Sequence, residues 1–452
     1  MKKNHRTKNF NLLKAVLKHE VFPAVGCTEP IAVAYAASIA GKVLKREITE
    51  IQIKVDPGIY KNGFAVMVPN TDGEHGNLIA GVLGALIRKP ELKMEILKSV
   101  NQDILKRAKE LIRMEKAHII CDRTRKRFYI EVSIKAGKES SMSVIEGSHT
   151  NLICLEHNNK KLPMAAHTSG KAHEDLKPLL RKLTIADLID LAQNMDREDY
   201  KYIKQGVAMN LRIAKAGQKL KKVGHYVSEL VTKGYLVNDV ISTCEVLTTS
   251  AADARMAGLN YPVMSSGGSG NQGIVAILVP YAVGKRYDIA DKTIVQSIAL
   301  SHLVNSYIKC FTGELSPLCG CAIAAGVGAA AAIVYQQAGK DIPKMTLAVN
   351  NLISDLGGML CDGAKAGCAL KVGSSTNSAI RSAYMALNNH GITHAEGFVG
   401  NTAEETIWNL SAISKQGMSL VDNTMLGIMM DKLSNKAVSS GDRTRRIKAP
   451  PA

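Results

Sequence analysis

The chain has 452 residues, of which 46% are hydrophobic and 22% charged, and its formal net charge at pH 7 is +18. The length exceeds what one compact core usually holds and predicts two domains, while the composition is ordinary for a soluble globular protein. Aromatic residues make up 4% of the chain and are not interleaved with the basic ones, which argues against nucleic-acid binding.

No segment has the pattern of a secretory leader or a membrane span. The basic start is followed by alternating polar and apolar residues, and the most apolar stretch, 322–335, is shorter than the roughly 20 residues that a bilayer requires. The nine cysteines are an odd number and are scattered, which argues against a disulfide framework and favours metal or redox chemistry. We therefore expect a cytoplasmic protein without a membrane or nucleic-acid partner.

The predicted elements change character along the chain. Helices are expected at 9–20 and 28–46, and then near 78–87 and 91–114, among strands at 51–55, 64–68, 128–134, 143–146 and 152–155. After Leu183 only helices are expected, separated by glycine-rich segments. The pattern predicts an α+β fold, with a large all-helical catalytic domain (1–46 and 165–438) and an inserted smaller α/β domain (47–164). Residues 439–452 are expected to form a disordered basic tail.

Four cysteines in the second half of the chain are candidates for a metal site. Cys319 and Cys321 lie at the start of a Gly/Ala-rich helix, and Cys361 and Cys368 follow later. Their spacing fits neither a zinc ribbon nor a ferredoxin motif. On a continuous helix, residues seven apart are separated by about 10 Å, but the two glycines between Cys361 and Cys368 permit a break. The residues alone leave open both a metal site and ordinary buried cysteines.

A glycine-rich loop (265–273) is a second candidate site. Glycines let successive backbone N–H groups converge, and the helix predicted from Ile274 would turn its positive end towards an anion. The loop also satisfies G-x-G-x-x-G, but the flanking segments lack the strands of a dinucleotide-binding fold. The residues alone also fit a plain flexible loop. As a carboxylate cradle it would consist of Ser265, Ser266, Gly267, Gly268, Ser269, Gly270 and Asn271.

Several motifs in combination resemble the cysteine desulfidase family, whose members are similar to the alpha chain of iron–sulfur serine dehydratases. The first is Gly-Cys-Thr-Glu-Pro at 26–30, and the others lie at 253–258, 265–273, 320–321, 361–365 and 396–400. The resemblance implies a [4Fe–4S] cluster with three protein ligands, at the matching positions Cys321, Cys361 and Cys368. It gives no role to Cys310 or to Cys319, and Cys319 is kept as a reserve ligand.

The activity implied by this resemblance is that of a carbon–sulfur lyase, L-cysteine desulfidase. Such an enzyme eliminates hydrogen sulfide from L-cysteine and leaves pyruvate and ammonia. Three cysteine ligands leave one iron open as a Lewis acid for the leaving group, and a soft iron–sulfur centre suits a thiolate. Cys27 is the implied base, which requires a lowered thiol pKa, or else a displaceable fourth ligand. Glu29 is expected to orient that base, to bind the substrate ammonium, or only to favour the first turn of its helix.

Two alternatives remain open. An L-serine dehydratase would use the same cluster on a hydroxyl leaving group and would also yield pyruvate and ammonia, but no sulfide. A non-catalytic metal- or cluster-binding sensor would need four protein ligands, with Cys319 or Cys27 as the fourth. In either enzyme the expected partner is a small amino acid, and a homo-oligomer is compatible with the sequence.

Overall fold

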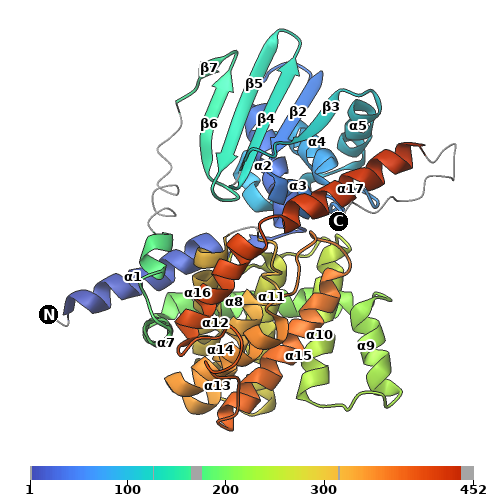
Figure 1. The fold of residues 1–452 in the computed structure, drawn as a ribbon. Coiled ribbons are helices and arrows are strands. Elements are labelled where there is room, and N and C mark those ends of the chain that lie inside the picture. Colours follow the sequence, from blue (N-terminus) through green and yellow to red (C-terminus); the bar gives the residue numbers. More distant parts are fainter. Residues whose placement is uncertain (1–2, 126, 164–175, 314–315, 439–452) are drawn as a thin grey trace.

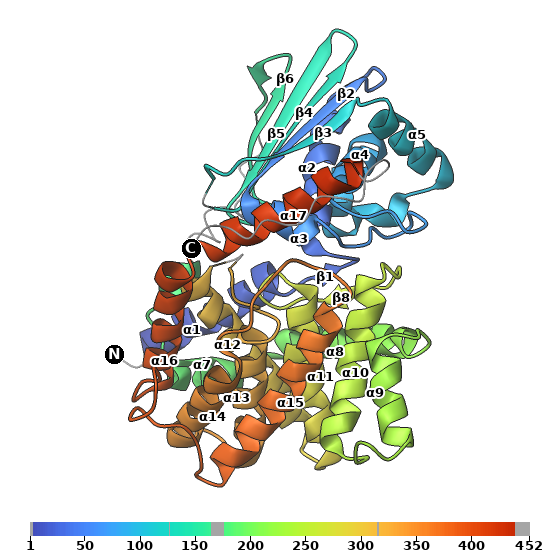
Figure 2. The same ribbon diagram turned by 45° about the vertical axis from the view of Figure 1, so that its right-hand side comes forward.

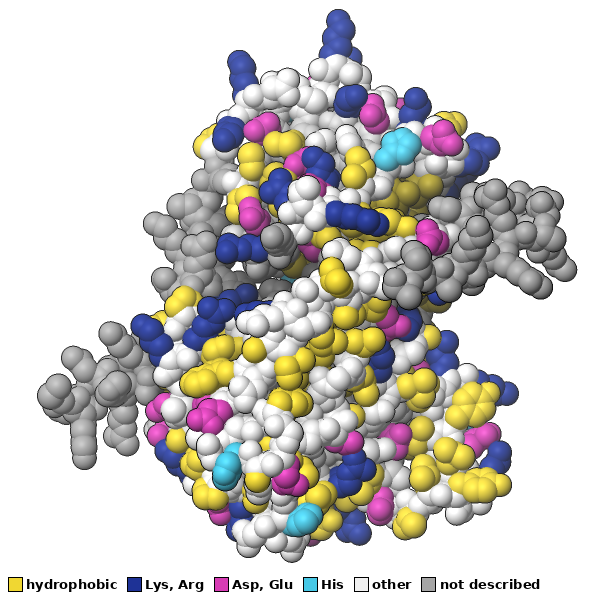
Figure 3. Space-filling model, in the orientation of Figure 1, with side chains coloured by type: hydrophobic (Ala, Val, Ile, Leu, Met, Phe, Trp, Pro, Cys, Tyr) yellow, Lys and Arg dark blue, Asp and Glu magenta, His cyan; other side chains and the backbone are white. Residues whose placement is uncertain are grey.

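The computed structural model describes residues 3–125, 127–163, 176–313 and 316–438. It is a mixed α/β structure with two large hydrophobic cores, one in a unit built on a six-stranded sheet and one in a helical unit (Figure 1). Within the described ranges, no helix combines the length and the apolar character needed to cross a membrane. On the face drawn in Figure 3, basic and acidic side chains are interspersed over both units.

The sheet unit begins with strands whose side chains alternate between buried and accessible positions. In β2 (Glu50–Val55) the alternate residues Ile51, Ile53 and Val55 are buried, as expected for a sheet with one covered face. The strand order is β3-β2-β4-β5-β6-β7, and only β2 and β3 are parallel. The remaining strands are β3 (Ala117–Cys121), β4 (Tyr129–Ala136), β5 (Glu139–Glu146), β6 (Leu152–His157) and β7 (Lys160–Lys161).

Helix α2 (Thr28–Lys42) covers this sheet. Two serine hydroxyls of β5 donate hydrogen bonds of 2.8 Å to its backbone, Ser141 to the carbonyl of Ala40 and Ser143 to that of Ala36. The sequence analysis grouped α2 with the helical domain, whereas its apolar side chains belong to the core of the sheet unit. The other helical elements of this unit are α3 (Pro57–Gly63), α4 (Asn77–Ile87), the 3-10 helix η1 (Pro90–Ser99) and α5 (Gln102–Arg113).

Two expected elements of the sheet unit take another form. The segment 64–68 is no strand of the sheet, because it folds back on the residues that follow it, with the Val68 N–H bonded to the Glu74 carbonyl and the Gly76 N–H to the Val66 carbonyl. The helix expected at 91–114 is divided, since the side chain of Asn101 caps a new helix by accepting the N–H of Ile104. Asparagine is a strong N-cap residue, which explains the division.

The helical unit packs closely because small residues face one another. A Cβ atom on Gly328 of α13 would lie 2.5 Å from the Ser301 carbonyl oxygen of α12, so these two helices approach at a distance that glycine permits. Its elements are α1 (Lys3–Glu20), α7 (Ile185–Gln193), α8 (Arg197–Gly217), α9 (Val223–Thr232), α10 (Val240–Met256), α11 (Gly270–Arg286), α12 (Asp291–Thr312), α13 (Ala324–Ala338), α14 (Ile342–Leu356), α15 (Cys368–Leu387), α16 (Ala403–Ala412) and the π-turn η2 (Ile413–Gly417).

Two passages of the chain between the units lie wholly within the described residues. Strand β1 (Pro23–Ala24) pairs antiparallel with β8 (Val263–Met264) just before α2 begins. At the other end of the chain, α17 (Val421–Val438) returns from the helical unit and lies along α3 (Figure 2). There the buried ammonium of Lys61 in α3 forms a 2.6 Å ion pair with Asp422. The tail expected at 439–452 lies outside the described residues.

Candidate active site

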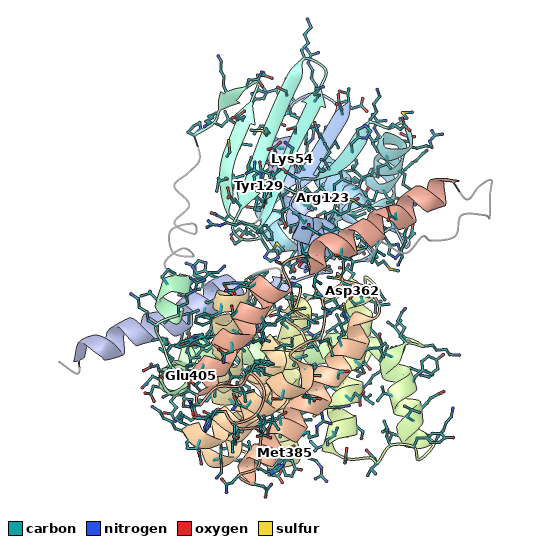
Figure 4. All side chains as sticks on the ribbon, in the orientation of Figure 1. Lys54, Arg123, Tyr129, Asp362, Met385 and Glu405 are labelled. Carbon is teal, nitrogen blue, oxygen red and sulfur yellow. The ribbon has the colours of Figure 1, made fainter. Side chains whose placement is uncertain are left out.

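A cavity lies where the two units meet, and both units contribute to its lining. The sheet unit supplies Cys27, Glu29 and Asn62, while the helical unit supplies the glycine-rich loop and a group of four cysteines. Asp362, within the segment that carries two of these cysteines, lies at this junction in Figure 4. The cavity therefore combines residues that the sequence analysis assigned to separate roles.

The four cysteines are brought together by pairing of two backbone segments. The N–H of Cys361 donates to the Pro317 carbonyl at 2.7 Å, and the N–H of Cys319 donates to the Met359 carbonyl at 2.8 Å. These bonds hold 317–321 and 359–361 side by side, and Cys368 follows as the first residue of α15. All four thiols, those of Cys319, Cys321, Cys361 and Cys368, line the cavity. Cys310 is buried in α12.

The pKa values of these thiols show that they affect one another. Burial and the negative charge of neighbouring thiols raise the pKa of Cys361 to about 11, although the charge of Lys61 opposes the rise. A hydrogen bond with Cys321 lowers the pKa of Cys319 to about 7. That bond, burial and the charges of the other thiols raise the pKa of Cys321. A site with several close thiols and nearby ammonium groups can hold anionic sulfur ligands.

The donor set consists of cysteine thiols, which are the ligands that iron–sulfur clusters use. Within the described part of the chain, no three His, Cys, Asp or Glu side chains are arranged to hold one metal ion. In a [4Fe–4S] cluster each cysteine binds a different iron, so the ligands lie further apart than those around one ion. Cys321, Cys361 and Cys368 are only partly exposed and border the same hollow, which agrees with this second arrangement.

Cys27 immediately precedes the first residue of α2 and points to a neighbouring carboxylate. Its Sγ atom donates a 2.8 Å hydrogen bond to Oε2 of Glu29, which also accepts the Thr28 hydroxyl at 3.1 Å. The other oxygen, Oε1, accepts the amide of Asn62 at 3.1 Å. Burial, followed by the negative charge of Glu29, raises the pKa of Cys27. This is the reverse of the lowered thiol pKa expected from the sequence.

Glu29 remains ionised although it is buried. Burial by itself would raise the pKa of its carboxyl, but a positive charge on His149, the Cys27 thiol bond and the charge of Arg255 hold the pKa below its usual value. His149 follows β5, lies against Phe128 with ring centroids 4.8 Å apart, and lines the cavity. The sequence analysis missed this histidine, because nothing in its local sequence marks it. His390 and His394, in the segment after α15, are exposed.

The glycine-rich loop divides into a part that faces the cavity and a part that supports it. Gly268, Ser269 and Asn271 line the cavity, and Ser269 directly precedes α11. Gly267 and Gly268 have φ of +53° and +72°, values that favour glycine. The supporting part includes Ser265 and Ser266, which are fully buried.

The two supporting serines have partners away from the cavity. The Ser265 hydroxyl accepts the N–H of Phe22 at 2.9 Å. The Ser266 hydroxyl lies 2.8 Å from Nδ1 of His302 and accepts the amide of Asn305 at 3.0 Å. Gly267 accepts the Lys309 ammonium through its carbonyl oxygen, and Gly270 packs against the Arg255 side chain. These contacts hold the loop in place, and Gly268, Ser269 and Asn271 form the part of the loop that faces the cavity.

The sequence profile of the family described as "Serine dehydratase alpha chain" matches residues 91–427. The chain belongs to the serine dehydratase alpha chain family. A UPF0597 protein from Geobacter sulfurreducens is 58% identical over 422 residues, covering 93% of this chain and 98% of the relative. One from Elusimicrobium minutum is 55% identical over 423 residues, covering 94% and 100%. Membership of the serine dehydratase alpha chain family indicates a lyase related to serine dehydratase.

Proposed function

We propose that the protein is an iron–sulfur-dependent L-cysteine desulfidase, which eliminates sulfide from L-cysteine and yields pyruvate and ammonia. The observation that carries this proposal is one cavity lined by four thiols, by the Cys27–Glu29 pair and by the exposed part of the glycine-rich loop. Elimination at the β carbon needs a group that takes the Cα proton and a group that accepts the leaving anion. The cavity offers candidates for both groups in its lining.

Cys321, Cys361 and Cys368 would hold the cluster, as the family resemblance implies. When bound, a [4Fe–4S] cluster with three cysteine ligands supplies a Lewis-acidic iron with an open position for the leaving group. Two ammonium groups lie close to these cysteines. Lys61 acts on the pKa of Cys361, and Lys371 donates to the Leu360 carbonyl at 2.6 Å and to Asp362 at 2.7 Å. Their positive charges would offset the negative charge of thiolate ligands.

Cys27 and Glu29 would act as one proton-transfer unit. The Cys27 thiol must lose its proton before it can take one from the substrate Cα, and the carboxylate 2.8 Å away is the group placed to receive it. The raised pKa of Cys27 means that the thiolate, once formed, is a strong base. Asn62 and Thr28 hold Glu29 in this orientation. The loop residues Gly268, Ser269 and Asn271 would bind the substrate carboxylate at the N-terminus of α11.

L-Serine dehydratase is the second candidate, and the family match favours it. The two substrates differ only in the leaving atom, so the same residues would serve both. A closed sensor site is the third candidate, because Cys319 lies with the other three thiols and its pKa is lowered to about 7 by its bond with Cys321. Four thiolate ligands would leave no iron open to a substrate.

Turnover after anaerobic reconstitution with iron and sulfide separates these candidates. The proposal expects sulfide and pyruvate in equal amounts from L-cysteine, and a higher kcat/KM for L-cysteine than for L-serine. Preference for L-serine would establish the dehydratase instead. A reconstituted protein that binds a cluster and turns over neither amino acid would favour the sensor.

A further inference from the structure

Arg255 is a buried cation in the cavity to which the family resemblance gives no role. It lies in the last turn of α10, is 3% exposed, and lines the cavity beside the glycine-rich loop. Its charge reaches both members of the proton-transfer pair, since it lowers the pKa of Cys27 and of Glu29. A guanidinium stays charged at any physiological pH, so this charge is permanent.

The hydrogen-bonding capacity of Arg255 is largely unused. Its Nη1 donates to Oδ1 of Asn271 at 3.1 Å, while Nε is buried without an acceptor and lies against Gly270. Among the described residues Arg255 forms no ion pair. A guanidinium has five N–H donors, and a buried charge without a counter-ion is costly. The negative end of α10 compensates only about half a charge.

Glu29, a carboxylate whose pKa is lowered by the charge of Arg255, already has its own hydrogen-bond partners. Oε2 of Glu29 accepts the Cys27 thiol and the Thr28 hydroxyl, and Oε1 accepts the Asn62 amide. Glu29 and Arg255 therefore attract each other electrostatically, while the oxygens of Glu29 accept their hydrogen bonds from other groups and occupy none of the N–H donors of Arg255. The cavity that Arg255 lines together with Ser269 and Asn271 is the place where a bound molecule can supply a counter-ion in direct contact with the guanidinium.

We propose that Arg255 supplies the positive charge that binds the α-carboxylate of the substrate, which makes the cavity specific for free amino acids over amides and amines. The guanidinium would add a charge-assisted contact to the backbone N–H groups of the loop. Glu29 carries the opposite charge in the same cavity and suits the ammonium end of such a zwitterion. This inference rests on the proposed function for its substrate class, but it concerns recognition rather than the leaving group.

Binding of two unreactive ligands tests the inference without turnover. L-Alanine and L-alaninamide have the same carbon skeleton and no leaving group, and only the first has a carboxylate. Dissociation constants would be measured by ligand-observed NMR on the anaerobically reconstituted protein. A contact between charged groups corresponds to about a 10- to 150-fold preference of the wild type for L-alanine. In Arg255→Met that preference should disappear, and in Arg255→Lys, which keeps the charge, part of it should remain.

Controls separate recognition from folding and from cluster binding. Circular dichroism reports folding, and if Arg255→Met fails to fold, the reduced preference of Arg255→Lys relative to wild type becomes the test. An equal affinity of the wild type for both ligands, or an unchanged preference in the variants, would overturn the inference. Loss of iron from Arg255→Met with the preference intact would overturn it too, because the charge would then serve the cluster. A wild type that prefers L-alanine but releases no sulfide would reject the desulfidase and keep this role for Arg255.

Discussion

The thiol of Cys27 donates a hydrogen bond to the carboxylate of Glu29 across 2.8 Å, at the start of the helix that covers the sheet. Burial and the charge of Glu29 raise the pKa of the thiol, while the pKa of Glu29 is lowered. The resting pair therefore keeps its proton on sulfur. Substrate binding has to change this balance before Cys27 can act as a base.

The first prediction concerns the proton acceptor. Glu29→Gln keeps the size of the side chain and removes its charge, so the variant should lower kcat by about 100- to 10,000-fold, the usual contribution of a proton-transfer group. Thr28→Val is the matched control, because it removes another hydrogen bond to the same Oε2 atom; its kcat should fall far less. Steady-state sulfide release measures both, and wild-type activity in Glu29→Gln would reject the pair as catalytic.

The second prediction concerns pH and stability. His302 is fully buried, and burial lowers its pKa to about 3, whereas an unfolded histidine has a pKa of about 6.5. Between these values the unfolded chain binds a proton that the native protein does not, so the free energy of unfolding decreases as the pH falls below about 6.5. The decrease is about 1.4 kcal/mol per pH unit. His302→Asn should lose this component.

Urea denaturation between pH 4.5 and 7 gives the free energy of unfolding at each pH. The contribution of His302 is the difference between wild type and His302→Asn in the slope of this free energy against pH. Ionisable groups common to both proteins cancel in the difference. His394→Asn, at an exposed position, is the control and should follow the wild-type slope. Parallel curves for wild type and His302→Asn would show that the buried imidazole does not titrate as described.

Sequence patterns predicted the sheet well where side chains alternate, as in β2 and β4. They failed for 64–68, because side chains alternate there too, but the backbone of this segment forms its hydrogen bonds with residues 74 and 76 instead of with a strand of the sheet. They also could not place α2, since residues 28–41 are buried all round and carry no polar face to indicate an orientation. The motifs named Cys27, Glu29 and the four cysteines, but His149 enters the cavity through tertiary packing alone.

The third prediction concerns the close contact between Gly363 and α3. Gly363 has φ of +90°, and a Cβ there would collide with the Lys61 carbonyl oxygen. Gly363→Ala should therefore displace the segment that carries Cys361 and Cys368 and lower the iron content after reconstitution. Gly358→Ala is the matched control, because a Cβ at that position meets no atom within 4 Å. Equal iron in the two variants would contradict the proposed position of the cluster.

The fourth prediction concerns the ion pair between the units. Lys61 is buried at 1% exposure and its ammonium lies 2.6 Å from Asp422. Asp422→Asn would leave the buried charge without its anionic partner, at a cost of about 1–3 kcal/mol, because Asp422 itself is partly exposed. Thermal denaturation should show a lower midpoint. Asp431→Asn, an exposed position on the same helix, should have the wild-type midpoint, and equal midpoints for both variants would contradict the ion pair's role.

The central claim is tested most directly by iron and acid-labile sulfide analysis of the anaerobically reconstituted protein and its single Cys→Ser variants. The wild type should bind about four iron and four sulfide per chain. Substitution of Cys321, Cys361 or Cys368 should remove most of this iron, and substitution of Cys154, which lies in β6 of the sheet unit, should remove none. Wild-type iron in all three variants, or no specific iron in the wild type, would contradict the account.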